Sequence, residues 1–335
     1  DTQATNFSVL RLKRDVLKRS AIGLMATNRS VAATGTGTNQ AYGVDGFFGL
    51  TRDLSLGTYW AKTQSDGLSG DDQSWQARMD YSADKYGAKL EALEVQPNFR
   101  PDVGFLRRTD FKRAFTELRY SPRPKGIKSV RKFTATAQGE YFENGAGQVD
   151  SRGLTGLFTT EFQSSDQFTI DATRNYEFLR TAFSPSGSPA AIPVGGYSFS
   201  DVGASYTFGA QRWASGQVSF RVGEYYDGTI RTLTIGGSGM TPSRLSFNKH
   251  LSIEPTFSIS DIDRGTNSFT TRLARARVDY GFTPLMFASA LVQFSSADHA
   301  VSANARFRWE YAPGSELFLV YTDERATEYL TPPPS

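Results

Sequence analysis

A two-residue alternation between apolar and polar side chains runs along most of this chain. Between Ser302 and Tyr311 every second residue is Ala, Phe, Trp or Tyr, and the residues between them are Ser, Asn, Arg or Glu. The segments 274–282 and 75–81 follow the same pattern. Because successive side chains of a β-strand point to opposite faces, each segment predicts a strand with one apolar face and one charged face.

The residues on the predicted apolar face are unusual for a soluble protein. The apolar face of a soluble sandwich would be rich in Val, Ile and Leu, whereas here it is mainly Ala, Gly and aromatic residues, with the aromatics close to strand ends. This pattern is typical of strands that turn apolar side chains to lipid and polar ones to a lumen. The sequence therefore predicts an all-β fold, a transmembrane antiparallel up-and-down β-barrel.

Composition narrows the class of protein further. The longest apolar runs cover only a few residues, whereas a membrane-spanning helix needs about 20. The chain has 335 residues and no Cys, which rules out disulfides and thiolate metal sites. Its 37 basic and 34 acidic residues are interspersed, a pattern that does not indicate binding to nucleic acid. We expect no cofactor and a single domain over residues 1–335.

Turn chemistry divides the alternating segments into about 18 predicted strands. Their approximate ranges are 6–14, 19–29, 41–52, 53–65, 72–82, 85–96, 104–121, 127–146, 148–165, 167–179, 196–209, 212–226, 228–247, 250–261, 267–282, 285–297, 300–312 and 315–323. Short connections are predicted at 52–53, 83–85, 164–166, 209–211, 248–249, 283–284 and 313–314, and longer ones at 30–40, 64–72, 97–103, 180–195 and 262–267. In outer-membrane barrels the short turns are periplasmic and the long loops extracellular. The longest, 183–194, is predicted to be a surface loop or a lumen plug.

This alternation places both ends of the chain on the extracellular side. Barrels of this kind normally begin and end in the periplasm, so either the predicted strand count is off at both ends or the chain is the central part of a larger barrel. The second interpretation is favoured because residues 326–335 have the composition of another long loop. The start of the chain has no basic or apolar stretch typical of a signal peptide, which favours a mature or trimmed chain.

Several segments together resemble a known family. They are Asn6–Val16, Ile22–Arg29, Gly67–Asp72, Asn98–Phe105, Gly223–Thr229, Leu273–Tyr280 and Tyr311–Tyr321. As a set they are similar to a functionally uncharacterised bacterial family in which a carbohydrate-binding-type β-sandwich precedes an outer-membrane barrel. The resemblance implies an outer-membrane location in a Gram-negative-type bacterium, a periplasmic sandwich upstream and further barrel strands on either side. It supplies no catalytic or ligand-binding residues.

Charged residues on the polar phase of the strands are the main functional candidates. The predicted lumen-lining residues are Arg78, Asp80, Lys89, Glu91, Arg113, Glu117, Arg119, Lys132, Glu140, Arg221, Arg275, Arg277, Asp279, Arg306, Arg308 and Glu310. In a wide barrel such charges select ions and solutes. The alternative is a set of cross-strand ion pairs that hold the wall together. The alternation of acids and bases favours the second role, and the two roles are compatible.

Aromatic residues on the apolar face of the predicted strands form a second group of candidates. They are Trp60, Trp75, Tyr81, Tyr86, Tyr120, Phe162, Tyr206, Phe208, Tyr280, Phe282, Trp309 and Tyr311, and many lie close to a short turn. Amphipathic rings gather at the edges of a bilayer, so we interpret them as interfacial girdles. The alternatives are a soluble core or a platform on which sugars stack.

Other motifs are weaker. The carboxylates of Asp261 and Asp263 before Gly265 resemble the start of a calcium loop, but the downstream Glu that such loops need is missing, so we predict a plain turn. His250 and His299 are the only histidines, and both lie beside predicted turns, which disfavours hydrolytic catalysis. The Gly-rich stretches 34–37 and 236–239 are not followed by predicted helices, so we interpret them as a loop and a β-bulge.

The sequence thus leaves three hypotheses for function. The first is a non-enzymatic, porin-like outer-membrane channel or transport barrel, linked through the family resemblance to saccharide handling. The second is a structural anchor with a plugged lumen, whose partners would be outer-membrane lipid and a periplasmic or surface protein. An outer-membrane hydrolase is the least favoured.

Overall fold

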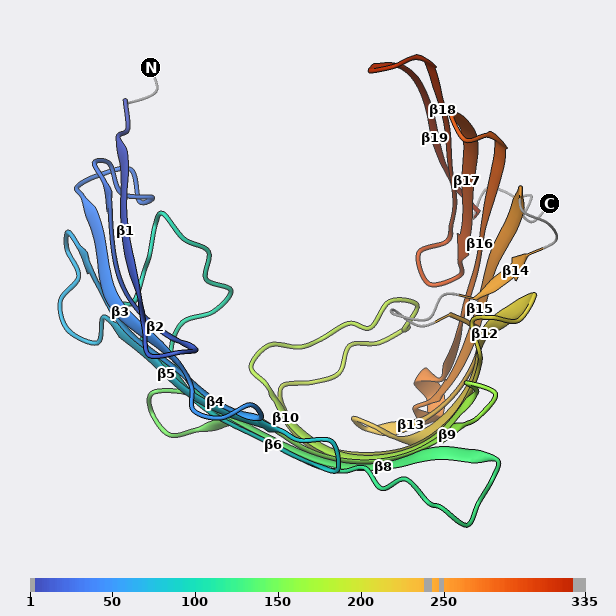
Figure 1. Ribbon diagram of the computed structural model, residues 1–335, viewed down its shortest axis with the longest axis horizontal. Coiled ribbons are helices and arrows are strands. Elements are labelled where there is room, and N and C mark those ends of the chain that lie inside the picture. Colours follow the sequence, from blue (N-terminus) through green and yellow to red (C-terminus); the bar gives the residue numbers. More distant parts are fainter. Residues whose placement is uncertain (1–3, 238–242, 247–249, 328–335) are drawn as a thin grey trace. The chain divides into compact units, whose positions relative to one another are not determined.

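The computed structural model describes residues 4–237, 243–246 and 250–327. Within these residues the chain forms 19 antiparallel strands of one up-and-down sheet and a single short helix, η1 (Gly265–Asn267) (Figure 1). The prediction of an all-β, antiparallel up-and-down fold is therefore confirmed. In the described part of the chain, no helix combines the length and apolar character needed to cross a membrane.

The strands are on average longer than those of a typical globular protein. The first ten are β1 (Phe7–Val16), β2 (Ser20–Arg29), β3 (Asn39–Gly49), β4 (Leu54–Ser65), β5 (Gln73–Ser82), β6 (Tyr86–Val95), β7 (Phe111–Tyr120), β8 (Val130–Glu143), β9 (Val149–Phe162) and β10 (Gln167–Leu179). The others are β11 (Gly195–Phe208), β12 (Ala214–Tyr225), β13 (Gly228–Gly236), β14 (Arg244–Ser246), β15 (Leu251–Asp263), β16 (Phe269–Thr283), β17 (Met286–Ser295), β18 (Ala300–Ala312) and β19 (Ser315–Ala326).

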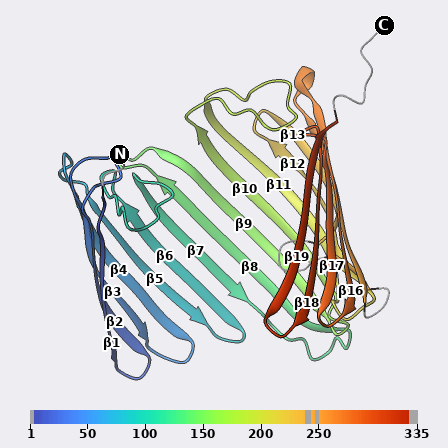
Figure 2. The same ribbon diagram turned by 90° about the horizontal axis from the view of Figure 1, so that it is seen from above.

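Contacts group the chain into two compact units. Unit 1 falls within Asp1–Pro122, Ala135–Gly156 and Asn175–Phe178, and unit 2 within Arg123–Thr134, Leu157–Arg174 and Leu179–Ser335. In unit 1 each strand from β1 to β7 pairs with the next, and in unit 2 the same meander runs from β11 to β19 (Figure 2). The expectation of a single domain stays a prediction.

One predicted strand is divided in two. The segment 228–247 forms β13 and β14, which continue the same path between β12 and β15. Gly236 ends β13 with a φ of 149°, in a region that L side chains rarely adopt, which breaks the ladder at the first residue of the Gly-rich stretch. The strand count is accordingly 19 rather than about 18. Residues 238–242, which include the end of that stretch, and the predicted turn 248–249 lie outside the described residues.

Most of the long connections lie at one end of the strands. The short turns predicted near Asp53, Lys85, Ser165, Ala210, Pro284 and Gly314 each join two consecutive strands. The longer connections at the other end of the strands are 30–38, 66–72, 96–110 and 180–194, and the connection 121–129 is a long one at the end with the short turns. We refer to the two ends of the strands as the turn end and the loop end.

The described strands bury very little apolar surface. The buried apolar residues are Ala32, Val95, Phe99, Val130, Ile192 and Ile262; three of these lie in loops and the other three lie at or next to strand ends. Large apolar side chains along the strands, such as those of Leu24, Val44 and Phe220, are exposed instead. A sheet with this pattern has no conventional hydrophobic core on either side of its strands.

Candidate functional site

The registers of unit 1 bring the predicted charged residues to one face. Residues directly opposite each other in an antiparallel pair share a face. One row across β4 to β8 contains Gly57, Arg78, Glu91, Phe115 and Glu140. The next row contains Ser55, Asp80, Lys89, Glu117 and Gln138, and Arg113 and Arg119 lie in adjacent rows of the same phase. We call this the polar face of unit 1.

Ion pairs join neighbouring strands across this face. Arg113 on β7 pairs with Glu91 on β6 and with Glu140 on β8, where its Nη2 lies 2.6 Å from Glu140 Oε1. Lys89 Nζ lies 2.8 Å from Glu117 Oε1, and Gln138 donates a hydrogen bond to the same carboxylate. These contacts are the cross-strand ladder that the sequence offered as the alternative to a selectivity role.

A further ion pair in unit 1 joins two strands that are not direct neighbours. Arg11 on β1 pairs with Asp45 on β3, and Gly23 lies between them on β2. A Cβ atom added at Gly23 would lie 2.6 Å from Arg11 Nη2 and 2.6 Å from Asp45 Oδ2. Only glycine therefore leaves room for this pair.

Unit 2 has an equivalent polar face. Arg221, Arg275, Arg277, Asp279, Arg306, Arg308 and Glu310 share one phase through the registers of β11 to β19. Arg221 pairs with Asp171 and Asp201, and Lys132 Nζ lies 3.7 Å from Glu161 Oε2. Arg308 pairs with Glu310 and Glu316, and Arg277 with Asp279.

Two arginines of this face have a different environment. Arg275 Nη2 lies 3.5 Å from Thr256 Oγ1, and Arg306 Nε donates to Asn304 Oδ1 over 3.1 Å. Both side chains are exposed, and within the described residues neither forms an ion pair with a carboxylate. Their charge is therefore less compensated than that of the other arginines on the face. The lumen-lining role predicted for all sixteen residues stays a prediction.

The opposite face of each unit carries the predicted aromatic residues. Trp60 lies opposite Trp75 and Tyr86 opposite Tyr120, with the two tyrosine ring centroids 5.4 Å apart. In unit 2 the rings of Tyr280 and Phe282, and of Trp309 and Tyr311, contact each other near the turn end. Lys85, in the turn between β5 and β6, places its Nζ 5.4 Å from both Tyr86 and Tyr120, and the negative charge that these phenols can carry raises its pKa.

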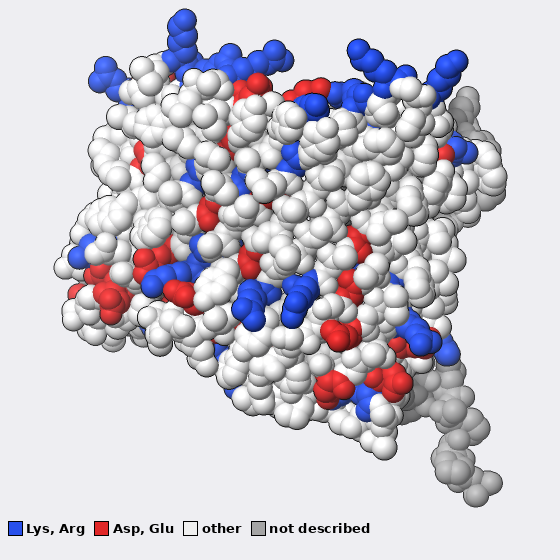
Figure 3. All heavy atoms as spheres, turned by 90° about the horizontal axis from the view of Figure 1, so that it is seen from below, with Lys and Arg blue, Asp and Glu red and all other residues white. Residues whose placement is uncertain are grey.

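Charged residues mark both margins of this apolar face. Connections at the turn end carry the basic residues Lys18, Arg19, Arg52, Lys85, Arg123, Lys125, Lys128 and Arg212. In the face shown in Figure 3, Lys and Arg gather along the upper margin, a largely uncharged band lies below it, and charged side chains of both signs reappear in the lower half. At the loop end, Trp75 donates its indole N–H to Glu94, and Lys112 pairs with Glu143 at 3.6 Å. Trp75 was predicted from the sequence as an interfacial residue, but the charged residues beside it at the loop end were not.

The loop 96–110 of unit 1 folds onto the polar face. Asn39 and Thr63, on β3 and β4, are each only 1% exposed. Asn39 donates to the carbonyl of Arg100 at 2.7 Å and accepts from the amide of Asp102 at 3.1 Å, while Thr63 Oγ1 accepts from the amide of Arg100 at 3.0 Å. Neutral side chains thus hold the first part of this loop against the strands, while Arg108 near its end pairs with Asp150 on β9.

A cavity of ≈ 470 Å³ lies beside this loop. Its lining combines the Arg11–Asp45 pair with Tyr59, Met25 and Phe99. A second, more polar cleft of ≈ 830 Å³ at the loop end is lined by Arg100, Arg107, Arg108, Asp66 and Asp102, among others. Unit 1 therefore has space for small solutes against its polar face.

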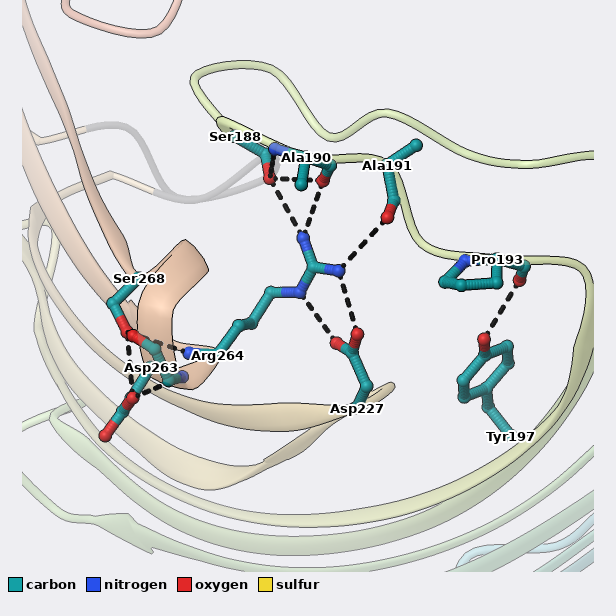
Figure 4. A network of polar contacts seen from close by, with 10 residues as sticks. Ser188, Ala190, Ala191, Pro193, Tyr197, Asp227, Asp263, Arg264 and Ser268 are labelled. Atoms are coloured by element: carbon teal, nitrogen blue, oxygen red, sulfur yellow. Dashed lines mark hydrogen bonds and ion pairs between the residues drawn. The ribbon is translucent and has the colours of Figure 1, made fainter.

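The connection 180–194 of unit 2 is held by a buried charge (Figure 4). Arg264 follows β15, and its side chain is only 3% exposed. Its guanidinium donates to Asp227 in the β12–β13 turn, with Nε–Oδ1 at 2.7 Å and Nη2–Oδ2 at 2.8 Å. It also donates to Ser188 Oγ at 3.0 Å, to Ala190 O at 2.7 Å and to Ala191 O at 3.3 Å. The hydrogen bonds from Arg264 lower the pKa of the Asp227 carboxyl.

A buried carboxylate stabilises the turn end of unit 2. Asp166, in the β9–β10 turn, accepts hydrogen bonds from the amide of Gly209, the hydroxyl of Tyr206 and the guanidinium of Arg212. These donors, the Gly209 amide first, lower the pKa of Asp166 to about 2. The β9–β10 and β11–β12 turns are thereby tied together.

The remaining predicted motifs have local roles. Asp263 accepts from the amide of Gly265 at 3.0 Å and from Ser268 Oγ at 2.8 Å, so it closes the turn before β16. His250 precedes β15 at the turn end, where its Nδ1 lies 2.7 Å from Gly281 O, and His299 precedes β18 at the loop end. Within residues 4–237, 243–246 and 250–327 no cluster of three or more His, Cys, Asp or Glu residues could hold a metal ion.

The comparisons with known proteins leave the resemblance untested. No protein-family model matches the chain, and no curated protein matches it. Membership of the outer-membrane barrel family therefore stays a prediction.

Proposed function

We propose that this chain is a membrane-spanning β-barrel of the bacterial outer membrane and that it forms a water-filled passage for small polar solutes. The observation that carries the proposal is the separation of the two faces. One face of each unit is charged and the other is apolar with aromatic rings near its margins, which is the arrangement expected of a sheet with lipid outside and water inside.

The length of the apolar stretch supports a membrane location. On β16 the apolar face is uncharged from Ala274 to Phe282, and Arg272 lies just beyond it. From Ala274 to Phe282 the strand rises roughly 26 Å, which at a barrel tilt of about 40° corresponds to roughly 20 Å of membrane thickness. That distance covers most of the apolar band of outer-membrane barrels, which is about 25 Å tall.

The exposed arginines favour a passage over a filled lumen. A charge enclosed in a packed interior needs a partner, because burying it alone costs several kcal/mol. Arg275 and Arg306 are exposed and contact only neutral oxygens among the described residues, which suits a face bathed in water. We expect a preference for anions. The family resemblance would link the passage to saccharides.

The second candidate is an anchor that holds a surface or periplasmic partner. The ion pairs on both polar faces favour it, since a ladder of paired charges also suits a rigid wall with no transport role. Planar-bilayer recordings separate the two candidates. Stable single-channel currents support the passage, and an inserted protein without currents supports the anchor.

A pair of substitutions tests the assignment of faces. Ala305 and Asn304 are neighbours on β18 and lie on the apolar and polar faces, respectively. Ala305→Arg would place a charge in lipid, at a cost of roughly 2–4 kcal/mol, whereas Asn304→Arg would place it in water. Urea unfolding in lipid vesicles measures both variants. Equal losses of stability at the two positions would contradict a membrane-facing apolar side.

A further inference from the structure

The connection 180–194, which we call the crossing loop, extends across unit 2. It joins β10 to β11, yet its Gly187 reaches β16 and the β17–β18 connection. A Cβ atom added at Gly187 would lie 3.4 Å from Thr271 Cγ2 and 3.4 Å from Ala297 Cα. From β11 to β16 the path crosses four strand spacings, roughly 19 Å of sheet. Thr271 belongs to the polar face, since it lies opposite Ser260 in the row of Arg221.

The crossing loop lies on the polar side of the strands rather than pointing away from them. Figure 1 shows it on the inner side of the curve formed by β11 to β16. We propose that the crossing loop narrows the passage and sets the largest solute that can enter, and that Arg264 is the residue that positions it. This inference rests on the passage proposed above.

The attachment of the crossing loop is strong enough for such a role. Arg264 bonds Ser188, Ala190 and Ala191 in the loop while Asp227 neutralises its charge. Releasing the loop would leave a buried guanidinium without these partners, which is costly. Arg264 thus holds the middle of the loop from a position between β15 and β16.

Apolar contacts hold the base of the loop. Ile192 is fully buried and forms a two-way backbone bridge with Phe183. The ring of Tyr226 contacts Phe183, with centroids 6.0 Å apart, and Tyr197, with centroids 5.5 Å apart. Tyr197 in turn donates its hydroxyl to Pro193 O at 2.9 Å. The loop is fixed at its base as well as at its middle.

The composition of the crossing loop specifies what it can discriminate. From Thr181 to Val194 it has no charged side chain. A neutral constriction distinguishes solutes by size, whereas the field of Arg275 and Arg306 acts on their charge. Size selection and charge selection are therefore assigned to different residues of unit 2 and can be separated by mutation.

The experiment uses the full chain reconstituted in planar bilayers. Two variants release the loop: Arg264→Met, and a shortened loop in which residues 184–191 are replaced by two glycines, which leaves Arg264 and Asp227 paired. The matched control is Arg325→Met, since Arg325 lies at the same end of the strands with its side chain 76% exposed. Polyethylene glycols of increasing size measure the diameter of the passage, and reversal potentials in a KCl gradient measure its charge preference.

We expect both loop variants to raise the conductance several-fold and to admit larger polymers, with the reversal potential and the Arg325→Met control unchanged. Arg275→Gln should do the opposite, shifting the reversal potential without changing the polymer limit. If only the shortened-loop variant conducts, the loop closes the passage completely in the unmodified protein, and this result would also support the inference. If the unmodified protein conducts and the shortened loop leaves its polymer limit unchanged, the crossing loop is no constriction and the passage stands. If no folded variant conducts, both proposals fail.

Discussion

Each unit folds one long loop onto its polar face, but the two loops are attached by different chemistry. In unit 1, Asn39 and Thr63 bind the backbone of the loop 96–110 through neutral hydrogen bonds. In unit 2, the crossing loop is attached through the guanidinium of Arg264 and its partner Asp227. All four side chains lie in strands or connections that are far from the two loops in sequence.

The difference has energetic consequences. A neutral hydrogen bond contributes about 0.5–1.5 kcal/mol, so the loop 96–110 depends on several of them acting together. A buried ion pair responds asymmetrically, because removing one partner leaves the other charge uncompensated. Arg264 is almost fully buried whereas 36% of the Asp227 side chain is exposed. The crossing loop should therefore be more sensitive to loss of the acid than to loss of the base.

The largest expected effect comes from Asp227→Ala. It leaves the buried guanidinium of Arg264 without its counter-charge, and we expect a loss of roughly 3–5 kcal/mol in the free energy of loop opening. Arg264→Met keeps most of the side-chain volume and leaves Asp227 accessible to water, so its effect should be smaller. Hydrogen exchange at the paired amides of Phe183 and Ile192 measures both. A larger effect for Arg264→Met would contradict this asymmetry.

Next in size is Asn39→Ala in unit 1. The substitution removes the partners of the Arg100 carbonyl and the Asp102 amide, and we expect the loop 96–110 to lose roughly 1–3 kcal/mol. Exchange of the Asp102 amide reports the change. The amides of Phe183 and Ile192 should be unaffected, and faster exchange there would show that the two loops are coupled.

A matched pair of glycine substitutions gives a smaller effect. Gly187 in the crossing loop has a φ of 81°, whereas Gly104 in the loop 96–110 is not in the left-handed region. Gly187→Ala should cost about 1–2 kcal/mol, because a Cβ atom disfavours that conformation. Gly104→Ala should cost close to nothing, since the added Cβ would lie 3.4 Å from its nearest neighbour, Pro101 O. Hydrogen-exchange rates in the two loops measure both costs. Equal costs would contradict the idea that the backbone conformation of Gly187 distinguishes the crossing loop from the loop 96–110.

A fall in pH should have the smallest effect of these changes, and it should affect the two loops differently. The pKa of Asp227 is lowered from 3.8 by its bonds to Arg264, so its contribution to stability is complete above that pH and is lost as the pH falls through the lower value. The Asn39 and Thr63 contacts have no proton to gain. We expect exchange at Phe183 and Ile192 in the crossing loop to accelerate below pH 3.8 relative to exchange at the Arg100 amide, which donates to the Thr63 hydroxyl. Parallel behaviour of both loops would argue against the charged attachment.

The faces of the strands were predictable because the two-residue period is a local property. Arg275, Ala276 and Arg277 alternate between faces whatever the strand pairs with, as do Asn304 and Ala305. Most of the turn positions were equally readable from Gly, Pro and Asp. The division of 228–247 into β13 and β14 was not, because Gly236 indicates where a ladder can break but not how far the chain then departs from it.

The attachments of the two loops could not be read from the sequence. Arg264 lies in a turn between Asp and Gly, and nothing in the neighbouring sequence indicates that its side chain is buried. Its partners lie 37 residues away at Asp227 and 74 residues away at Ala190. Asn39 and Thr63 look like ordinary strand residues, although they bind the backbone of Arg100. Long-range contacts of this kind depend on strand register and loop path, which no short segment encodes alone.

The sequence by itself determined that this chain is an antiparallel meander with one charged and one apolar face, because side-chain alternation follows directly from strand geometry. Only the tertiary structure decided which acid meets which base, such as Arg113 with Glu91 and Glu140, and which loops return over the polar face. Those choices follow from the registers between strands, which bring side chains together irrespective of their distance along the chain.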